Sequence, residues 1–216
     1  MQKKIIICTM ILFNLILLDC NESLKLSPDI KKKFIKEIPH YDNGDTDIFY
    51  QSIKAFSKKL NLSNIEKGDD SLRIRVWYDF ALIGNKKLVD ISCTNSKWSA
   101  VLYQWIGYLK FDSSEKVIVE NIKNSTLNPQ TSWINILKKI NQLQILTLPN
   151  MDRIPGLRDD WADGHTVSFE IGTKKNYRFY SYHMTEKFAA KFWQADNVEK
   201  FLDMIELEFK VEKNSW

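Results

Sequence analysis

Two histidines at the open end of a predicted hairpin are the residues best placed to do chemistry. His165 opens and His183 closes this hairpin, and Asp163 stands two residues before the first of them. Two facing imidazoles with a carboxylate nearby could hold a transition metal or set a general base against an acid. These three residues therefore define one alternative for the function, a hydrolase working through His165, His183 and Asp163.

The facing arrangement depends on the register of the hairpin. Pairing Phe169 with Phe179 collects the apolar side chains on one face and sets Glu170 opposite Arg178, an opposite-charge pair on the other face. A slip by one residue would divide the apolar side chains between the faces. We therefore expect this register, which brings the two imidazoles directly opposite each other.

Other patterns that carry chemistry are absent from the sequence. No HExxH, GxSxG, GxGxxG or GxxxxGK[ST] pattern occurs, and the acidic residues of the loop over 148–164 lack the spacing of a calcium loop. Cys93 lies in a predicted strand, where a thiol is usually a small buried hydrophobe. We therefore expect no metal and no cofactor, and a protein that is not an enzyme is the leading interpretation.

Aromatic side chains offer a second kind of site. Tyr180 and Tyr182 fall on the face opposite Phe169 in the expected register, and Trp161 lies in the long loop over 148–164. If helices cover one face of the sheet only, the two tyrosines are exposed and could stack on a sugar or anchor a protein partner. If helices cover both faces, the tyrosines belong to the core.

The elements that position these residues alternate in a way that is typical of an α+β fold. A helix should begin at Thr46 or Asp47, and a second at Thr131 or Ser132; Thr185 and Asp196 should begin two C-terminal helices. Strands are expected over 72–82, 87–93, 98–111, 117–122, 165–171 and 177–183, with turns at 84–85 and 94–97. We expect an antiparallel sheet of about five or six strands, a meander plus the C-terminal hairpin, packed on one face by helices.

Composition supports a single compact domain over residues 47–216. The chain has 216 residues, 44% hydrophobic and 27% charged, which is enough to bury a core. Its formal net charge of +4 is mild and scattered, so no nucleic-acid partner is expected.

The first nineteen residues have the pattern of a secretory signal peptide. Lys3 and Lys4 precede a mostly apolar run over 5–18, which is shorter than the roughly 20 residues of a membrane span. The segment Leu17-Leu18-Asp19-Cys20 resembles the lipobox of bacterial lipoproteins, although Asp19 stands where Gly, Ala or Ser is usual. The resemblance covers residues 1–20 only. It implies a covalent lipid on Cys20 and attachment to a membrane of the cell envelope.

The stretch over 20–46 is polar and rich in lysine, and we expect it to be a tether or N-terminal arm with a short helix over 30–38. Without lipidation, Cys20 could instead form a disulfide with Cys93. The expected protein is an exported, lipid-anchored binding or protective module on the periplasmic or outer-surface side of a Gram-negative envelope. Its possible partner is a protein or a glycan.

Overall fold

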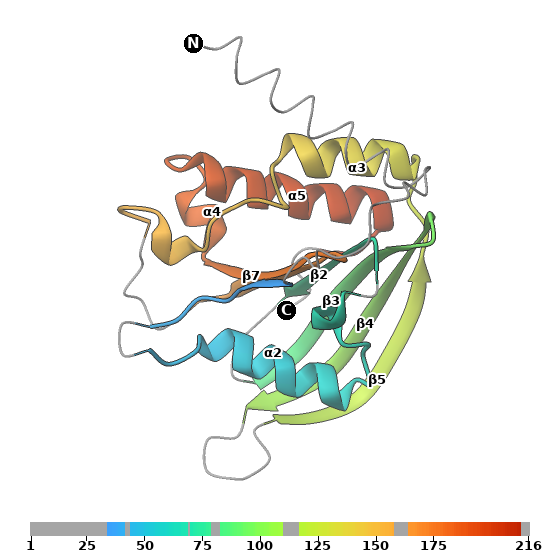
Figure 1. Cartoon of the computed structure of the whole chain (residues 1–216), viewed down its shortest axis with the longest axis horizontal. Coiled ribbons are helices and arrows are strands. Elements are labelled where there is room, and N and C mark those ends of the chain that lie inside the picture. Colours follow the sequence, from blue (N-terminus) through green and yellow to red (C-terminus); the bar gives the residue numbers. More distant parts are fainter. Residues whose placement is uncertain are drawn as a thin grey trace, which may run out of the picture.

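The fold is α+β, a seven-stranded sheet with helices on both sides (Figure 1). A computed structural model describes residues 34–41, 44–68, 70–78, 83–109, 117–157 and 164–212. The strands are β1 (Ile35–Glu37), β2 (Leu72–Tyr78), β3 (Ile83–Thr94), β4 (Lys97–Leu109), β5 (Val117–Leu127), β6 (Thr166–Gly172) and β7 (Asn176–His183). The helices are α2 (Ile48–Lys59), α3 (Trp133–Gln142), α4 (Thr185–Phe188) and α5 (Trp193–Phe209), with short 3-10 turns η1 (Ile65–Lys67) and η2 (Met151–Arg153).

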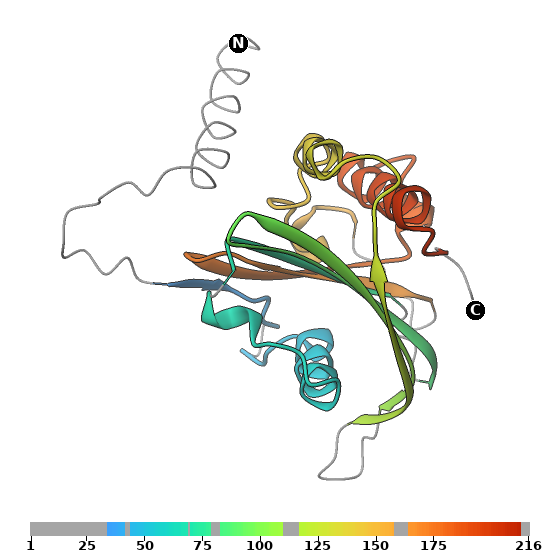
Figure 2. The same ribbon diagram turned by 90° about the vertical axis from the view of Figure 1, so that its right-hand side faces the viewer.

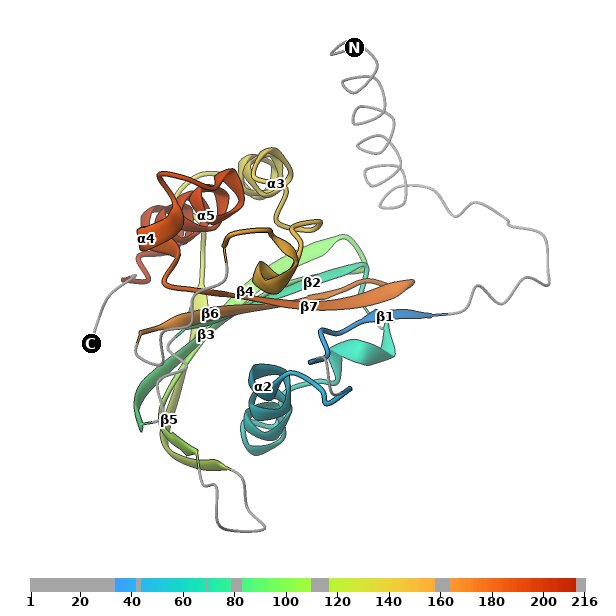
Figure 3. The same ribbon diagram turned by 90° about the vertical axis from the view of Figure 1, so that its left-hand side faces the viewer.

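The sheet has the order β1-β7-β6-β2-β3-β4-β5, and every neighbouring pair is antiparallel except β1 with β7. Helices α3 and α5 cover one face, and α2 covers the other (Figures 2 and 3). The expectation of five or six strands covered on one face was therefore wrong in both respects. The additional strand is β1, which lies where a short helix was expected, and α2 encloses a second core that the sequence pattern had not separated from the first.

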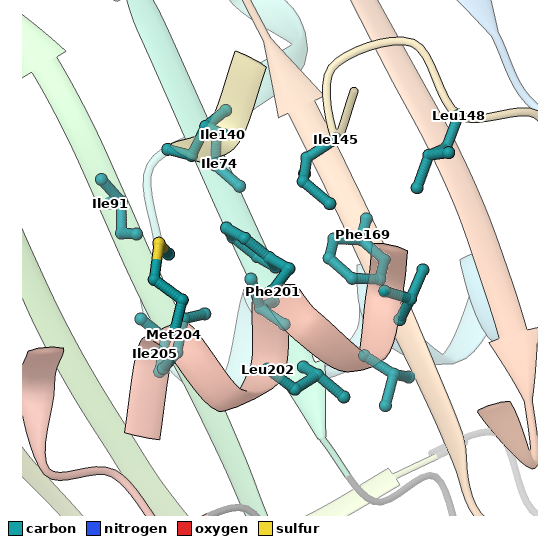
Figure 4. Packing of buried hydrophobic residues seen from close by; sticks show 14 of the residues in the cluster. Ile74, Ile91, Ile140, Ile145, Leu148, Phe169, Phe201, Leu202, Met204 and Ile205 are labelled. Carbon is teal, nitrogen blue, oxygen red and sulfur yellow. The ribbon is translucent and has the colours of Figure 1, made fainter. Parts of the chain in front are cut away.

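The face under α3 and α5 is apolar and tightly packed. Its side chains come from the central strands and from the two helices, and they include Ile74, Ile91, Phe169, Phe201 and Ile205, each at most 3% exposed (Figure 4). Burying a side chain of this size stabilises a fold by about 1.5–3 kcal/mol. This layer, the α3/α5 core, is the larger of the two.

The face under α2 combines aromatic and charged side chains. Asp47 caps α2 by accepting hydrogen bonds from the amides of Phe49 and Tyr50, at 2.7 and 3.1 Å. The helix then presents Ile53 and Phe56 at the spacing of one helical face, and both are fully buried. The Phe56 ring lies 5.6 Å from that of Trp105. Both helix residues belong to a second buried layer, the α2 core, together with Trp77, Leu88, Trp105, Tyr177 and Phe179 of the sheet and with Leu60, Ile65 and Val117.

A glycine brings α2 close to the sheet. A Cβ at Gly107 would lie 3.2 Å from the Phe56 ring and 2.8 Å from Trp105 Nε1. A larger residue would force the side chains of Trp105 and Lys86 to shift and would crowd Phe56, so glycine at this position lets the three side chains pack closely.

The hairpin of β6 and β7 has a register one residue away from the expected one. Phe169 pairs with Tyr180 and Glu170 with Phe179, so His183 stands opposite Thr166 rather than His165. The expected register assumed a single buried face. Because both faces are buried, the apolar side chains of this hairpin can divide between two cores without exposure.

Several boundaries also differ from the expected ones. The hairpin turn expected at 84–85 is wrong, because Gly84 and Asn85 lie inside β3. The helix expected to begin at Asp196 begins at Trp193. The strand from residue 72, the turn before Lys97 and the cap at Ser132 are confirmed.

No helix within the described ranges is both long and apolar enough to span a membrane.

Candidate functional site

The two histidines of the hairpin have separate partners. His183 Nδ1 lies 2.9 Å from the hydroxyl of Thr166, its cross-strand neighbour. His165 Nε2 lies 3.1 Å from a carboxylate oxygen of Glu186 on α4. The structure does not place the imidazoles opposite each other, so the geometric basis for a two-histidine site is lost. Across the part of the chain that is described, no cluster of three His, Cys, Asp or Glu side chains could hold a metal ion.

The two tyrosines proposed as an exposed binding face lie in the α3/α5 core. Tyr180 and Tyr182 are each 1% exposed, and their hydroxyls donate hydrogen bonds to the carbonyl oxygens of Ile145 and Pro149, at 2.6 and 2.9 Å. Burial raises the pKa of Tyr180 well above that of a free phenol. Neither ring can contact a sugar or a protein partner, so the exposed-face hypothesis is wrong for these residues.

Three further candidates, Asp163, Trp161 and Cys20, lie outside the described residues. Cys93 is buried in β3, as the strand pattern predicted.

A charged network lies inside the α2 face. Arg75 of β2 and Glu170 of β6 are cross-strand partners, each 1% exposed, with 3.8 Å between Nη1 and Oε2. Arg75 Nε also donates to Asp90 at 3.1 Å, and its Nη2 donates to the carbonyl of Ser63 at 2.9 Å. Burial disfavours the charged guanidinium, but the carboxylates of Asp90 and Glu170 outweigh it and raise the pKa of Arg75.

Glu170 accepts two hydrogen bonds in addition to this ion pair. Trp77 Nε1 donates to it at 2.9 Å and the Tyr177 hydroxyl at 3.0 Å. Burial nevertheless dominates and raises the pKa of the Glu170 carboxyl. A buried acid with a raised pKa is a common feature of catalytic sites, but structural ion pairs produce it too. Here the polar atoms of Arg75 and Glu170 face other protein groups, and each of the two side chains is 1% exposed.

A second charged group ties α2 to the rim of the sheet. Glu66 of η1 accepts hydrogen bonds from Lys36, Lys54 and Tyr50, at 2.7, 2.6 and 2.9 Å. Burial alone would raise the pKa of Glu66, but these three donors outweigh it and hold the pKa at about 2. The cluster connects β1, α2 and η1, and it fixes the position of α2 relative to the edge of the sheet.

Aromatic and basic side chains lie side by side at the start of α5. Trp193, the first residue of α5, is 51% exposed. Beside it, the ammonium of Lys187 lies 5.4 Å from the ring centroid of Phe188, and that of Lys191 lies 5.3 Å from the ring of Phe192. We call these five residues the aromatic corner.

Sequence reasoning missed both the buried network and the exposed corner. Glu170 was assigned to Arg178, but Arg178 donates to Glu37 at 2.8 Å and Glu170 pairs with Arg75. The sequence pattern placed Trp193 in the apolar stripe of the short helix that begins at Thr185, but Trp193 is the first residue of α5 and is 51% exposed. The available signal was the alternation of Arg73 and Arg75 with apolar residues in β2, which places two charges on the face of a central strand that also carries Trp77.

Comparison of the chain with protein-family models, with curated proteins and with solved structures yields no significant match. The class of protein is therefore defined by its fold, an α+β domain with a sheet covered on both faces.

Proposed function

We propose that this protein is an exported, lipid-anchored module that binds or protects at the cell envelope without catalysing a reaction. The location depends on one feature, the segment Leu17-Leu18-Asp19-Cys20 at the end of the apolar run over 5–18. Attachment through Cys20 would hold the folded domain at a membrane by the thirteen residues 21–33. A fully extended chain of that length reaches about 45 Å.

The observation that carries the binding part of the proposal is the distribution of polar chemistry between inside and outside. The most deeply buried ion pair described here, Arg75 with Glu170, lies inside the α2 face. The aromatic corner, in contrast, lies at the surface, where Trp193 is half exposed. Tryptophan is enriched among the side chains that supply binding energy in protein interfaces, so the half-exposed Trp193 supports a binding function.

The anchor is tested by comparing two cysteine variants in a Gram-negative host. We expect the wild-type protein in the membrane fraction, with an intact mass that starts at Cys20 and includes a diacylglyceryl group. Cys20→Ala should move it to the soluble exported fraction, whereas Cys93→Ala, which removes the buried thiol of β3, should leave it in the membrane fraction.

An unmodified mass, or a chain that keeps residues 1–19, would contradict the anchor. If both cysteine variants changed the electrophoretic mobility of the protein in the absence of reductant, the Cys20–Cys93 disulfide would be the better explanation, and the lipid anchor would be rejected.

A further inference from the structure

The imidazole of His183 has one ring nitrogen that the fold does not use. The hydroxyl of Thr166, its cross-strand neighbour, lies 2.9 Å from Nδ1, which fixes the orientation of the ring. The other nitrogen, Nε2, is buried and has no hydrogen-bond partner within the described ranges. A buried polar atom without a partner is uncommon in native proteins, and a bound water molecule or ion is one physical reason for it. The ring therefore offers a donor atom for a ligand.

A thioether lies beside this ring. A Cβ at Gly164 would lie 2.4 Å from Met184 Sδ and 2.9 Å from His183 Cε1, the carbon bonded to Nε2. The sulfur and the edge of the ring therefore border the same small space, which exists because residue 164 has no side chain. The φ of Gly164 is +140°, a value that other residues rarely adopt, so the backbone itself favours glycine here.

The backbone holds Met184 in this position. Its φ and ψ, 50° and 49°, are left-handed, which is uncommon for a residue other than Gly, Asn or Asp. Its amide donates to the carbonyl oxygen of His165 at 3.0 Å. A second sulfur lies nearby, because Met151 Sδ accepts a hydrogen bond from the His183 amide at 3.1 Å. One imidazole and two thioethers therefore lie together at the end of β7.

The type of donor determines which ion these side chains favour. Thioether sulfur is a soft ligand that selects Cu(I), and imidazole also binds copper. None of the donors is negatively charged, so burying a monovalent ion among them costs less than burying a divalent ion. The side chains of His183 and Met184 are partly exposed, so an ion can enter from the surface.

We propose that His183 Nε2, Met184 Sδ and Met151 Sδ form a binding site for a soft monovalent metal ion, Cu(I). Thr166 is a positioning residue: when Nδ1–H donates to its hydroxyl, the lone pair of the ring is on Nε2. The sequence predicted no metal because it lacks dense histidine and carboxylate motifs, which do not include thioethers. The site is separate from the aromatic corner, goes beyond the function proposed above and requires no lipid.

Competition for Cu(I) against a chromophoric chelator tests the site in the full chain. The parent protein carries three substitutions that remove competing thiols, Cys8→Ala, Cys20→Ala and Cys93→Ala. We expect it to bind one Cu(I) ion. Thr166→Val should weaken binding about tenfold, as is usual when a group that orients a metal ligand is lost.

Loss of a ligand should have a larger effect. His183→Asn keeps a polar atom for Thr166 but removes Nε2, and Met184→Leu keeps the size of the side chain but removes the sulfur. Each should weaken Cu(I) binding at least about a hundredfold, and Met151→Leu about tenfold. The matched controls are His40→Asn, at an exposed position, and Met204→Leu, in the α3/α5 core; both should leave the affinity unchanged.

Nuclear magnetic resonance with Ag(I), a redox-inert ion of the same charge, locates the ligands directly. Ag(I) should shift the Nε2 resonance of His183 and the methyl resonance of Met184, and should leave those of His40 and Met204 in place. Thermal unfolding midpoints check that each variant is folded.

Other outcomes overturn the proposal. These are a folded parent that does not bind Cu(I), equal losses in the ligand and control variants, and tighter binding of Zn²⁺ than of Cu(I). Because the parent lacks Cys20, none of these results bears on the lipid anchor. An unmodified Cys20 in the native host would, conversely, contradict the anchor and leave the metal site standing.

Discussion

Both faces of the central sheet are buried, but different chemistry holds their helices. The α3/α5 core is built from aliphatic and aromatic side chains, with Phe201 and Ile205 fully enclosed. The α2 core has a comparable aromatic base in Trp77 and Trp105, and places the Arg75–Glu170 pair beside it. In an apolar core each buried side chain adds to the free energy of unfolding. In a buried ion pair, the loss of either partner leaves an uncompensated charge and is strongly destabilising. The α3/α5 face thus supplies stability, and we infer that the α2 face specifies how the strands align.

The largest effect is expected from a cavity in the α3/α5 core. Phe201→Ala removes a ring that is fully buried and lies 5.9 Å from the ring of Phe169. The free energy of unfolding should fall by about 3–5 kcal/mol. Urea denaturation measures this change. Leu207→Ala, at a 71% exposed position on the same helix, is the control and should change stability by less than about 0.5 kcal/mol. Equal losses in the two variants would mean that α5 is not packed as described.

The next effect tests the ion pair of the α2 face. Glu170→Gln keeps the shape of the side chain but leaves Arg75 buried with Asp90 as its remaining carboxylate. Stability should fall by about 3 kcal/mol, because removing one partner leaves a charge that burial penalises. Glu120→Gln on the exposed β5 edge is the matched control and should be nearly neutral. A neutral Glu170→Gln would show that Glu170 does not stabilise Arg75.

The difference between the faces also explains which features the sequence could predict. Helix α2 and strand β2 follow from local signals, the Asp47 cap and the alternation that begins at Leu72. The register of β6 with β7 does not, because Phe169 and Phe179 each have a core to enter and no local pattern assigns them to one face. Arg75 and Glu170 are 95 positions apart in the chain, so no local pattern predicts their pairing. Trp193 begins α5 after the short helix α4 has ended at Phe188, a boundary that the apolar spacing does not predict. Such features are set by tertiary contacts.

A smaller loss of stability is expected when the hydrogen bonds between α2 and Glu66 of η1 are removed. Tyr50→Phe removes the hydroxyl that donates to Glu66 at 2.9 Å but keeps the ring, which lies 5.5 Å from that of Phe179. Stability should fall by about 1 kcal/mol, the net value of one hydrogen bond to a charged group at a partly exposed site. Lys54→Met, which removes another donor to Glu66, should act in the same direction. A gain in stability for either variant would contradict the tie.

The smallest effect is a change in pH dependence. The pKa of Glu66 is about 2, below the usual value of 4.5 in the unfolded chain. The folded state therefore favours the ionised carboxylate. This contribution is complete above about pH 5 and is lost as the pH falls toward 2. Glu66→Gln should flatten the decline of the unfolding free energy in that window, and solvent screening keeps the change modest. An unchanged slope between pH 5 and 2 would contradict the lowered pKa.

The most direct test of the account is a double-mutant cycle across the α2 face. Its central claim is that Arg75 and Glu170 act as one closed structural pair and not as a site for a substrate. Arg75→Met and Glu170→Met should each be strongly destabilising, and the double variant should be more stable than the sum of the two losses predicts by at least about 1.5 kcal/mol. Strictly additive losses would contradict the claim, because the two charges would then be independent of each other.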